Sequence, residues 1–315
     1  MASNPRGLVA TLTMNPAIDL CFSVDGISPT RKLRAYDLRR DPGGGGINVA
    51  RVIGRLGGEA LAVFPAGGPT GERLRSMLEA GGTAHRATDA AGETREDFTA
   101  WNRENGEQYR FVLPGPELTL AEQQAALEAV MESGAGIIVA SGSLPSGVPA
   151  AFYAGLALRA REAGSKLALD AAGPALAEGL VAGVWLVKPN LGELEQLVGA
   201  PLPVLSARLG ACRDLIGRRA AEVVALSMGP EGALLATEDG AWLCATPPLT
   251  PISTVGAGDS FMGGLVQALA DGRKAPEALA RAVAAGSAAL LAPGTQLCQA
   301  EDVARLAREI SATRL

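Results

Sequence analysis

The strongest constraint on the fold is a regular alternation of short apolar runs with segments of helical periodicity. Six runs have the length and apolar content of buried strands: 7–14, 60–67, 136–143, 166–171, 184–190 and 222–229. Intervening segments such as 47–58, 70–82 and 119–134 repeat apolar residues at helical spacing. This alternation favours a mainly parallel sheet with helices on both faces. We therefore expect one α/β domain over residues 1–315, with ligands at the carboxyl ends of its strands.

Two segments interrupt this alternation. Residues 17–41 are polar and rich in turn residues, and 95–113 have the pattern of a β-hairpin. Asn105 and Gly106 predict a type I′ turn between the two hairpin strands. We expect these excursions to form a small β-sheet that covers the site as a lid, or that pairs with a second subunit to give a homodimer.

Charge and composition exclude several classes of protein. The net charge of -5 argues against a nucleic-acid surface, which needs basic patches to neutralise phosphates. No apolar run reaches the roughly 18–20 residues that a membrane-spanning helix needs. The first ten residues, MASNPRGLVA, lack the apolar centre of a signal peptide. We expect a soluble, cytoplasmic protein with no nucleic-acid or membrane partner.

The cysteines and the single histidine give no sign of a metal centre. Cys21, Cys212, Cys244 and Cys298 are widely spaced and form no C-x-x-C pair, which argues against zinc. We expect them to be reduced and mostly buried. His85 follows a Gly-rich segment, and we expect it in a polar loop without a catalytic role.

The stretch STVGAGDSFMGG, 253–264, combines a glycine-rich turn with the beginning of a helix. The glycines let backbone N–H groups point at a bound anion, and the helix dipole adds favourable potential. Asp259 falls in the first helical turn, where it can accept a proton from an alcohol that attacks a phosphoryl group held by those N–H groups. The structural alternative is that Asp259 only stabilises the helix N-terminus.

Three further stretches also allow both a functional and a purely structural interpretation. Residues 41–58 contain four glycines before a helix, which favours close approach of a ligand, and Asn48 can bind sugar hydroxyls. A dinucleotide-binding turn is disfavoured, because a charged segment and not a buried strand precedes the glycines. In 188–199, Asn190 and Glu193 fit a capping box, or a nucleotide-phosphate site with Mg²⁺. In 13–19, Asp19 is either a sugar ligand or an exposed turn residue.

Together, the stretches resemble the ribokinase-like (PfkB) family of sugar kinases. GGGGINVAR and STVGAGDSFMGG match its two signatures, and SGSLPSGVP, KPNLGELE and SMGPEGAL match intermediate blocks, in order from Thr11 to about Cys298. No Walker A or protein-kinase signature occurs. The resemblance implies a ribokinase-like mainly parallel sheet and ATP-dependent transfer with Mg²⁺. The blocks are most similar to those of the minor-type 6-phosphofructokinases, which implies phosphorylation of fructose 6-phosphate at its C1 hydroxyl.

The resemblance also implies roles for individual residues. It gives Asp259 as the base, with an anion hole of amides from Gly256, Ala257 and Gly258. Sugar-phosphate contacts would come from Asp19, Lys32, Gly43, Gly44, Asn48, Arg95, Arg110 and Ser143. ATP contacts would come from Lys188, Asn190, Ser227, Gly229, Gly232, Thr254 and Ser287. Glu193 would organise Mg²⁺ through water, and a monovalent cation such as K⁺ would bind near Ser253, Val255, Ala289 and Gly294.

Alternatives remain at this point. Ala292 and Gln296 stand where relatives often have asparagine and arginine, which puts cation binding in question. The 1-phosphofructokinases and tagatose-6-phosphate kinases usually carry lysine at the position of Gly45, so glycine favours fructose 6-phosphate. Those two activities remain the nearest alternatives, followed by a nucleoside or ribose kinase. Arg95 and Arg110 could be no more than exposed hairpin charges, and a non-catalytic sugar-phosphate sensor is the alternative of a different class.

Overall fold

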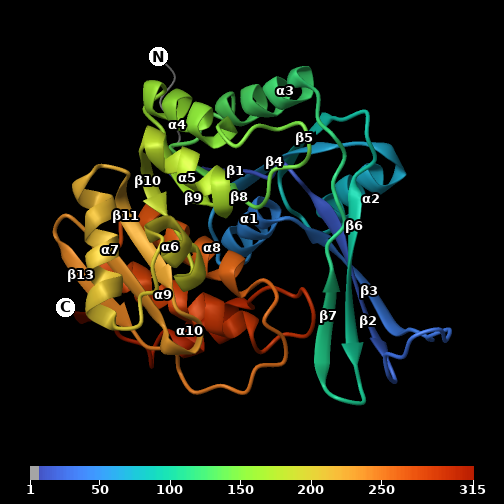
Figure 1. The fold of residues 1–315 in the computed structure, drawn as a ribbon. Helices are drawn as coiled ribbons and strands as arrows, with labels where there is room; N and C mark the ends of the chain where they lie inside the picture. The colour runs from blue at the N-terminus through green and yellow to red at the C-terminus, as the bar shows by residue number, and fades with distance from the viewer. Residues whose placement is uncertain (1–6) are drawn as a thin grey trace.

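The computed structural model describes residues 7–315; residues 1–6, part of the stretch without a signal-peptide centre, lie outside it. A ten-stranded sheet forms the centre of the molecule (Figure 1). Its strands are β1 Val9–Leu12, β4 Ala60–Ala66, β5 His85–Asp89, β8 Ile137–Ser141, β9 Lys166–Asp170, β10 Val184–Val187, β11 Ala221–Ser227, β12 Ala233–Thr237, β13 Gly240–Cys244 and β14 Thr313–Arg314. Their order is β14-β13-β12-β11-β10-β9-β8-β1-β4-β5, parallel from β11 to β5 and antiparallel at the other edge.

Helices cover both faces of this sheet, as the alternation in the sequence predicts. The helices α3 Leu120–Met131, α4 Phe152–Glu162, α5 Gly173–Ala182, α6 Leu191–Val198 and α7 Leu205–Gly217 share one apolar core with the sheet. The opposite core contains α1 Gly45–Arg55, α8 Ala257–Ala270, α9 Ala275–Ala289 and α10 Ala300–Leu306. Successive strand residues enter opposite cores, as Ile138 and Val139 do, since side chains alternate across a strand. This explains why the central strands are continuous apolar runs.

The two segments that interrupt the alternation pair with each other in a separate small sheet. Its order is β3 Tyr36–Gly43, β2 Ala17–Val24, β6 Arg95–Asn102 and β7 Glu107–Phe111, and it projects to one side of the main body (Figure 1). Ile18 of β2 packs with Ile47 of α1, Phe64 of β4 and Leu74 of α2 Gly68–Ala80. This apolar contact attaches the base of the small sheet to β4, α1 and α2 of the main body.

The hairpin is present, but the predicted type I′ turn is wrong. Type I′ requires positive φ at both central residues. Only Gly106 has one, at φ 71°, and Asn102 pairs with Glu107 across a four-residue loop. Asn105 stabilises this loop through its side chain, which accepts a hydrogen bond from the Glu107 amide at 3.0 Å.

Two further expectations about local structure also need correction. His85 does not lie in a loop: it begins β5, and its ring stacks on Phe64 with centroids 5.9 Å apart. The sequence of β5 has no apolar alternation, so pairing with β4 rather than its own pattern makes it a strand. The antiparallel hairpin of β12 and β13, with the short helix η1 Gly229–Glu231 before it, was likewise not predicted from the sequence.

The cysteines have the environment expected of them. All four cysteines are buried and none is bonded to another. Burial raises the pKa of each thiol, to about 12 for Cys212. Over residues 7–315, every helix is too short or too polar to traverse a lipid bilayer.

The contact between α1 and α8 generates a prediction about stability. A Cβ at Gly263 would lie 2.6 Å from Cγ1 of Val52, whereas one at Gly54 meets nothing within 4 Å. Overpacking a core costs roughly 1–3 kcal/mol, while glycine to alanine in an open helical position gains about 0.5–1 kcal/mol. Gly263→Ala should therefore lower the free energy of unfolding in urea, and Gly54→Ala should leave it unchanged or raise it. Equal effects of the two substitutions would contradict this packing.

Candidate active site

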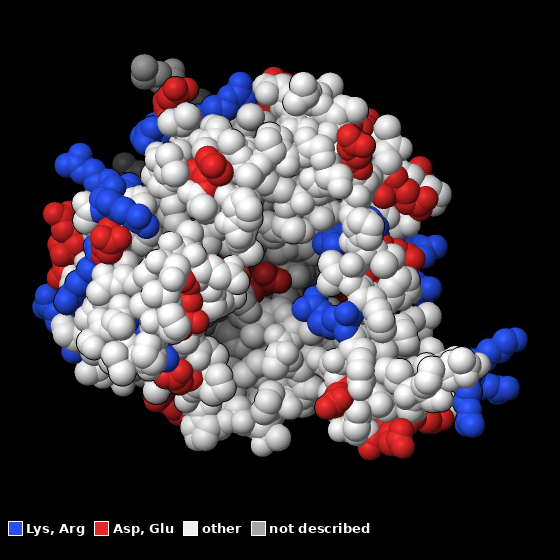
Figure 2. All heavy atoms as spheres, in the orientation of Figure 1, with Lys and Arg blue, Asp and Glu red and all other residues white. Residues whose placement is uncertain are grey.

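A cleft opens between the carboxyl ends of the parallel strands and the small sheet. Figure 2 shows the hollow, with acidic atoms deep inside and basic atoms on the side of the small sheet. Its walls come from the α1 and α8 N-termini, the ends of β8 and β9, the start of α6, and strands β2, β6 and β7. This is the place where an open α/β sheet binds its ligands.

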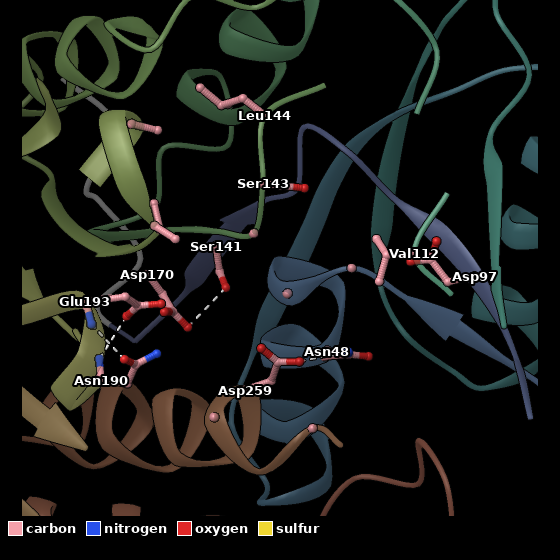
Figure 3. Close-up of a pocket in the computed structure, with 18 of the residues that line it drawn as sticks. Asn48, Asp97, Val112, Ser141, Ser143, Leu144, Asp170, Asn190, Glu193 and Asp259 are labelled. Carbon is pink, nitrogen blue, oxygen red and sulfur yellow. Dashed lines mark hydrogen bonds between the residues drawn. The ribbon is translucent and has the colours of Figure 1, made fainter. Parts of the chain in front are cut away.

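The N-terminus of α8 combines backbone donors with one carboxylate. Gly256 is the N-cap residue, with φ 78°, and no side chain caps the helix. The amides of Ala257, Gly258 and Asp259 belong to the first turn, whose N–H groups have no partner within a helix. Asp259 accepts a hydrogen bond at 2.9 Å from Nδ2 of Asn48, which lies on the adjoining helix α1 (Figure 3).

The surroundings of Asp259 make it a stronger base than an exposed aspartate. Burial, followed by the negative charge of Asp170, raises the pKa of Asp259 to about 6. The hydrogen bond from Asn48 and the cations Lys188 and Arg110 oppose this rise. A carboxyl with this pKa is ionised at neutral pH and is well matched to proton abstraction.

The glycine run brings Asp19 against the beginning of α1. A Cβ at Gly43 would lie 2.7 Å from the Asp19 carboxylate, so only glycine allows this approach. Thr13 supports the turn, because its hydroxyl accepts a hydrogen bond from the Ile47 amide at 2.8 Å. Burial, then the charge of Asp97, raises the pKa of Asp19 to about 7. The cleft therefore holds two aspartates that titrate near neutrality.

The three cations expected at the sugar phosphate have different positions. Arg110 lines the cleft, and its side chain has no ion-pair or hydrogen-bond partner among residues 7–315. Arg95 also lines the cleft, but its side chain is only 9% exposed and forms an ion pair with Asp97 at 3.4 Å. It donates to the carbonyls of Leu113 and Asn15 at 2.8 and 3.2 Å. Lys32 is exposed in the connection between β2 and β3 and does not line the cleft. The expected convergence of three cations thus reduces, within this chain, to Arg110 beside a largely satisfied Arg95.

On the other side of the cleft, the capping box at α6 is present. The Asn190 side chain accepts from the Glu193 amide at 2.9 Å, and Glu193 accepts from the Asn190 amide at 2.8 Å. Both residues also line the cleft, so the structural and functional interpretations are compatible. Ser143 lies at the sugar side of the cleft, where its hydroxyl accepts from Asn15 at 3.1 Å.

Sequence reasoning missed Asp170, which ends β9 in the cleft (Figure 3). Asp170 forms a 3.0 Å ion pair with the buried Lys188 and lies 3.4 Å from the Ser141 hydroxyl. A Cβ on Gly258 would come 3.8 Å from the Lys188 nitrogen, which places this cation by the α8 amides. The sequence did contain a signal that could have identified Asp170, because an aspartate stands at the carboxyl end of the predicted strand 166–171.

Asp170 and Glu193 are the carboxylates that can serve a divalent cation. Burial raises the pKa of Glu193, and the amide of Asn190 and the charge of Lys188 oppose that rise. No group of three or more acidic, histidine or cysteine ligands occurs among the described residues. A hard cation here would therefore complete its shell with water and phosphate oxygens, as Mg²⁺ usually does.

The other residues expected to contact ATP lie outside the cleft that Asn190 lines. Ser227 forms an isolated parallel bridge with Asn190, and Gly229 and Gly232 follow it with φ of 59° and 101°. Ser287 is buried in α9 and Thr254 is exposed before α8. None of these residues lines the same cleft as Asp259, so the structure gives them a place beside it rather than within it.

The segments proposed to hold a monovalent cation meet beside the α8 N-terminus. The Ser253 hydroxyl donates to the Gly294 carbonyl at 2.9 Å and accepts from the Val255 amide at 3.2 Å. Ala289 ends α9 just before the same loop, and its carbonyl accepts from the Ala292 amide at 3.2 Å. These residues are thus gathered in space, with their carbonyls partly engaged within the protein.

Comparisons with known proteins find relatives over nearly the whole chain. An ATP-dependent 6-phosphofructokinase isozyme 2 from Mycobacterium tuberculosis is 44% identical over 299 residues, covering 94% of this chain and 88% of that protein. A 1-phosphofructokinase from Xanthomonas campestris is 35% identical, with 90% and 91% covered. The crystal structure of phosphofructokinase-2 from Escherichia coli in complex with potassium superposes with a TM-score of 0.93 at 39% identity, covering 96% of this chain and 99% of that one.

The family model agrees with these relatives. The model of the pfkB family carbohydrate kinases matches residues 11–302, a span that includes Asp19, the glycine run, Asp170, the α6 capping box and Asp259. The chain therefore belongs to the pfkB family of carbohydrate kinases.

Proposed function

We propose that this chain transfers the γ-phosphoryl group of ATP to the C1 hydroxyl of fructose 6-phosphate, giving ADP and fructose 1,6-bisphosphate. The observation that carries the proposal is Asp259, held by Asn48 at an uncapped helix N-terminus in a cleft that Arg110 lines on one side. On the other side the buried Lys188 lies behind Asp170 and close to Gly258. Such a site has a base, backbone donors for a phosphoryl group and a cation on each side, which direct phosphoryl transfer needs.

In the proposed reaction, the Asp259 carboxylate removes the proton of the C1 hydroxyl as its oxygen bonds to the γ-phosphorus. The bond from the γ-phosphorus to the bridging oxygen breaks, and ADP leaves with that oxygen. The amides of Gly256, Ala257 and Gly258 stabilise the charge on the transferring group. Lys188 neutralises phosphate charge near these amides, and the proton on Asp259 passes to solvent after product release. Magnesium bound near Asp170 and Glu193 would neutralise the phosphates of ATP.

Recognition of the sugar falls to the other side of the cleft. Asp19 accepts hydrogen bonds from the furanose hydroxyls, beside Gly43 and Gly44. Arg110 binds the 6-phosphate, since its guanidinium has no competing partner in the part of the chain that the structure describes and arginine suits phosphate geometry. Arg95 instead holds the backbone on which this side of the site is built. A Cβ at Gly45 would collide with the Ser141 hydroxyl, so the lysine of the 1-phosphofructokinase pattern does not fit here.

The small sheet acts in this proposal as a lid and as a surface for a second copy of the chain. Four large apolar side chains are exposed on it: Tyr36, Leu38, Trp101 and Phe111, the last two of them 36% and 54% accessible. The strand register puts Trp101 and Phe111 on opposite faces of the sheet, so a homodimer would bury the apolar side chains of one face. Such burial would stabilise the lid and help to exclude water from the reaction. ATP and the sugar phosphate are cytoplasmic metabolites, and we place the chain there.

We also propose a monovalent cation near Ser253, Val255, Ala289 and Gly294, because the Escherichia coli neighbour was crystallised with potassium. It would lie beside the anion hole and offset phosphate charge. The departures at Ala292 and Gln296 predict that activation by K⁺ differs in strength from that of relatives with asparagine and arginine there.

The base assignment predicts the effect of Asp259→Asn. Turnover of fructose 6-phosphate should fall by about 10²–10⁴-fold, the usual contribution of a general base, with KM nearly unchanged. Because its pKa is raised above the unfolded value, the Asp259 carboxylate destabilises the folded protein at neutral pH, so the variant should melt at the same or a higher temperature. Coupled detection of ADP and fructose 1,6-bisphosphate measures turnover, and a loss under tenfold would remove the assignment.

The titration of the cleft predicts a dependence on pH. Asp259 can remove a proton, and Asp19 can accept hydrogen bonds from the sugar hydroxyls, when their carboxyl groups are ionised. Activity should therefore be lost as the pH falls through the pKa values of these two groups. The kcat/KM for fructose 6-phosphate should decline below pH 7 and steeply below pH 6, where Asp19 and then Asp259 become protonated. Initial rates from pH 5 to 9 in buffers of constant ionic strength measure this, and a flat profile down to pH 5 would contradict it.

The placement of Arg110 predicts a specific loss of acceptor binding. Hydrogen bonds to charged groups contribute about 1.5–3 kcal/mol, so Arg110→Gln should raise KM for fructose 6-phosphate roughly tenfold to a hundredfold and leave KM for ATP unchanged. Arg103→Gln is the matched control: Arg103 lies on the same hairpin but pairs with Asp37 at 2.7 Å, outside the cleft. Equal effects of the two variants would exclude a specific role for Arg110.

An acceptor screen decides among the kinase activities. We expect fructose 6-phosphate to give the highest kcat/KM in a set with fructose 1-phosphate, tagatose 6-phosphate, ribose and adenosine. The same ADP-release assay separates an enzyme from a non-catalytic sensor, which would bind sugar phosphate without releasing ADP.

A further inference from the structure

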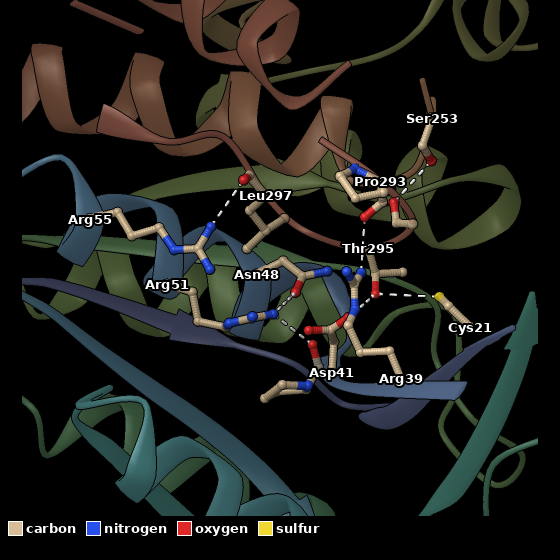
Figure 4. A network of polar contacts seen from close by, with 12 residues as sticks. Cys21, Arg39, Asp41, Asn48, Arg51, Arg55, Ser253, Pro293, Thr295 and Leu297 are labelled. Carbon is tan, nitrogen blue, oxygen red and sulfur yellow. Dashed lines mark hydrogen bonds and ion pairs between the residues drawn. The ribbon is translucent and has the colours of Figure 1, made fainter. Parts of the chain in front are cut away.

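Arg51 lies on α1 one turn after Asn48 and makes two contacts through one nitrogen. Its Nη1 donates to the Pro42 carbonyl at 2.8 Å and to Oδ1 of Asn48 at 3.1 Å (Figure 4). Nδ2 of the same amide donates to Asp259 at 2.9 Å. A continuous hydrogen-bonded chain therefore runs from Arg51, through one side-chain amide, to the carboxylate in the cleft.

The chemistry of the two end groups determines how this amide is oriented. A guanidinium has donors only, and an ionised carboxylate has acceptors only. The Asn48 amide between them must therefore present its oxygen to Arg51 and its NH₂ group to Asp259. A turn of the amide by 180° would set donor against donor and acceptor against acceptor. Without the guanidinium, the contact with Asp259 alone would oppose such a turn, since Arg51 gives the hydrogen bond at Oδ1 among the described residues.

We propose that Arg51 is a positioning residue for phosphoryl transfer: it orients the Asn48 amide so that this amide donates to one oxygen of Asp259 and leaves the other oxygen for the acceptor hydroxyl. The inference rests on the role proposed for Asp259 as the base. Arg51 itself does not line the cleft, so it acts through Asn48 and not on the substrate.

The environment of Arg51 suits this role. Burial, and after it the neighbouring Arg55, lowers the pKa of Arg51 to about 10, so the side chain stays cationic at neutral pH. Asp41 and Asp19 face it with opposite charge, and Arg39 faces it with like charge. Its second acceptor, Pro42, immediately precedes the glycine that admits Asp19. One guanidinium thus connects the base to the backbone on the sugar side.

Substitution of Arg51 by methionine tests the inference. Asp259 is faced by Asp170, Lys188 and Arg110 from other elements, and these are unchanged in the variant. With the donated hydrogen bond weakened, the acid limb of the kcat profile should move up by about one pH unit, since one pKa unit corresponds to 1.36 kcal/mol. Turnover should fall by about tenfold or more, and KM for both substrates should stay within about threefold.

Arg55→Met is the matched control. Arg55 lies one turn further along α1 and donates to the carbonyls of Leu297 and Cys298 at 3.0 and 3.3 Å, without touching Asn48. The Arg55→Met variant loses one positive charge from the same helix but keeps the contact between Arg51 and Asn48. It should therefore leave the acid limb of the kcat profile in place. A shift of the limb in both variants would mean a general loss of charge, and would overturn the proposal.

A double-mutant cycle distinguishes action through Asn48 from an independent structural role. If Arg51 works through the amide, adding Arg51→Met to Asn48→Ala should cause no further loss of kcat and no further shift in pH. Additive losses would overturn the proposal. Thermal unfolding checks that each variant is folded, and Arg51→Gln, too short to reach both acceptors, replaces the methionine variant if that one is not.

A readout that does not depend on turnover separates this inference from the proposed function. Carboxyl-carbon NMR titration of the wild type should show the pKa of Asp259 near 6, higher in Arg51→Met and unchanged in Arg55→Met. An unchanged pKa in Arg51→Met overturns the positioning role, whichever sugar is the substrate. Absence of fructose 6-phosphate turnover in the wild type would instead overturn the proposed function while this titration still tests Arg51.

Discussion

The hydrogen bond between Asn48 and Asp259 is the interaction on which the rest of the site depends, because it joins the N-termini of two helices that start 212 residues apart, at Gly45 and Ala257. Both helices begin in glycine turns, and both pack on one face of the sheet. Gly263 allows α8 to approach Val52 of α1 closely enough for the two termini to meet. The packing of the core therefore sets the geometry of the base.

The site holds negative charge that lowers the stability of the folded protein, and the proposed reaction requires this charge. Asp19 and Asp259 have pKa values raised by burial to about 7 and about 6, so each carboxylate is destabilising in the folded protein at neutral pH. Lys188 is stabilised in the same region by Asp170 at 3.0 Å. A phosphorylated sugar and a nucleotide bring further negative charge, which Arg110, Lys188 and the α8 amides are placed to receive. Substrate binding thus completes an electrostatic arrangement that the protein alone leaves unbalanced.

Sequence reasoning predicted the parallel core, the small sheet and the residues of both glycine turns, because these depend on periodicity and on local backbone freedom. It did not predict β5, whose strand character comes from pairing with β4. It also did not predict the conformation of the loop at Asn105 and Gly106, where only Gly106 has positive φ and the Asn105 side chain accepts a hydrogen bond from the Glu107 amide. Asp170 was missed because it lies at the carboxyl end of the predicted strand 166–171 and belongs to none of the glycine-rich or capping stretches from which the site was inferred. The family resemblance grouped Lys32 and Arg95 with Arg110 at the sugar phosphate. Only tertiary contacts show that, within this chain, Arg95 is engaged by Asp97 and two carbonyls and Lys32 lies outside the cleft.

The most direct test of the central claim is a crystal structure with fructose 6-phosphate and a non-hydrolysable ATP analogue. The account predicts one oxygen of Asp259 within hydrogen-bond reach of the C1 hydroxyl, about 2.6–3.2 Å, with the other oxygen on Asn48 and the γ-phosphate at the first amides of α8. A complex in which the C1 hydroxyl is held by another group, with Asp259 turned away from it, would contradict the account.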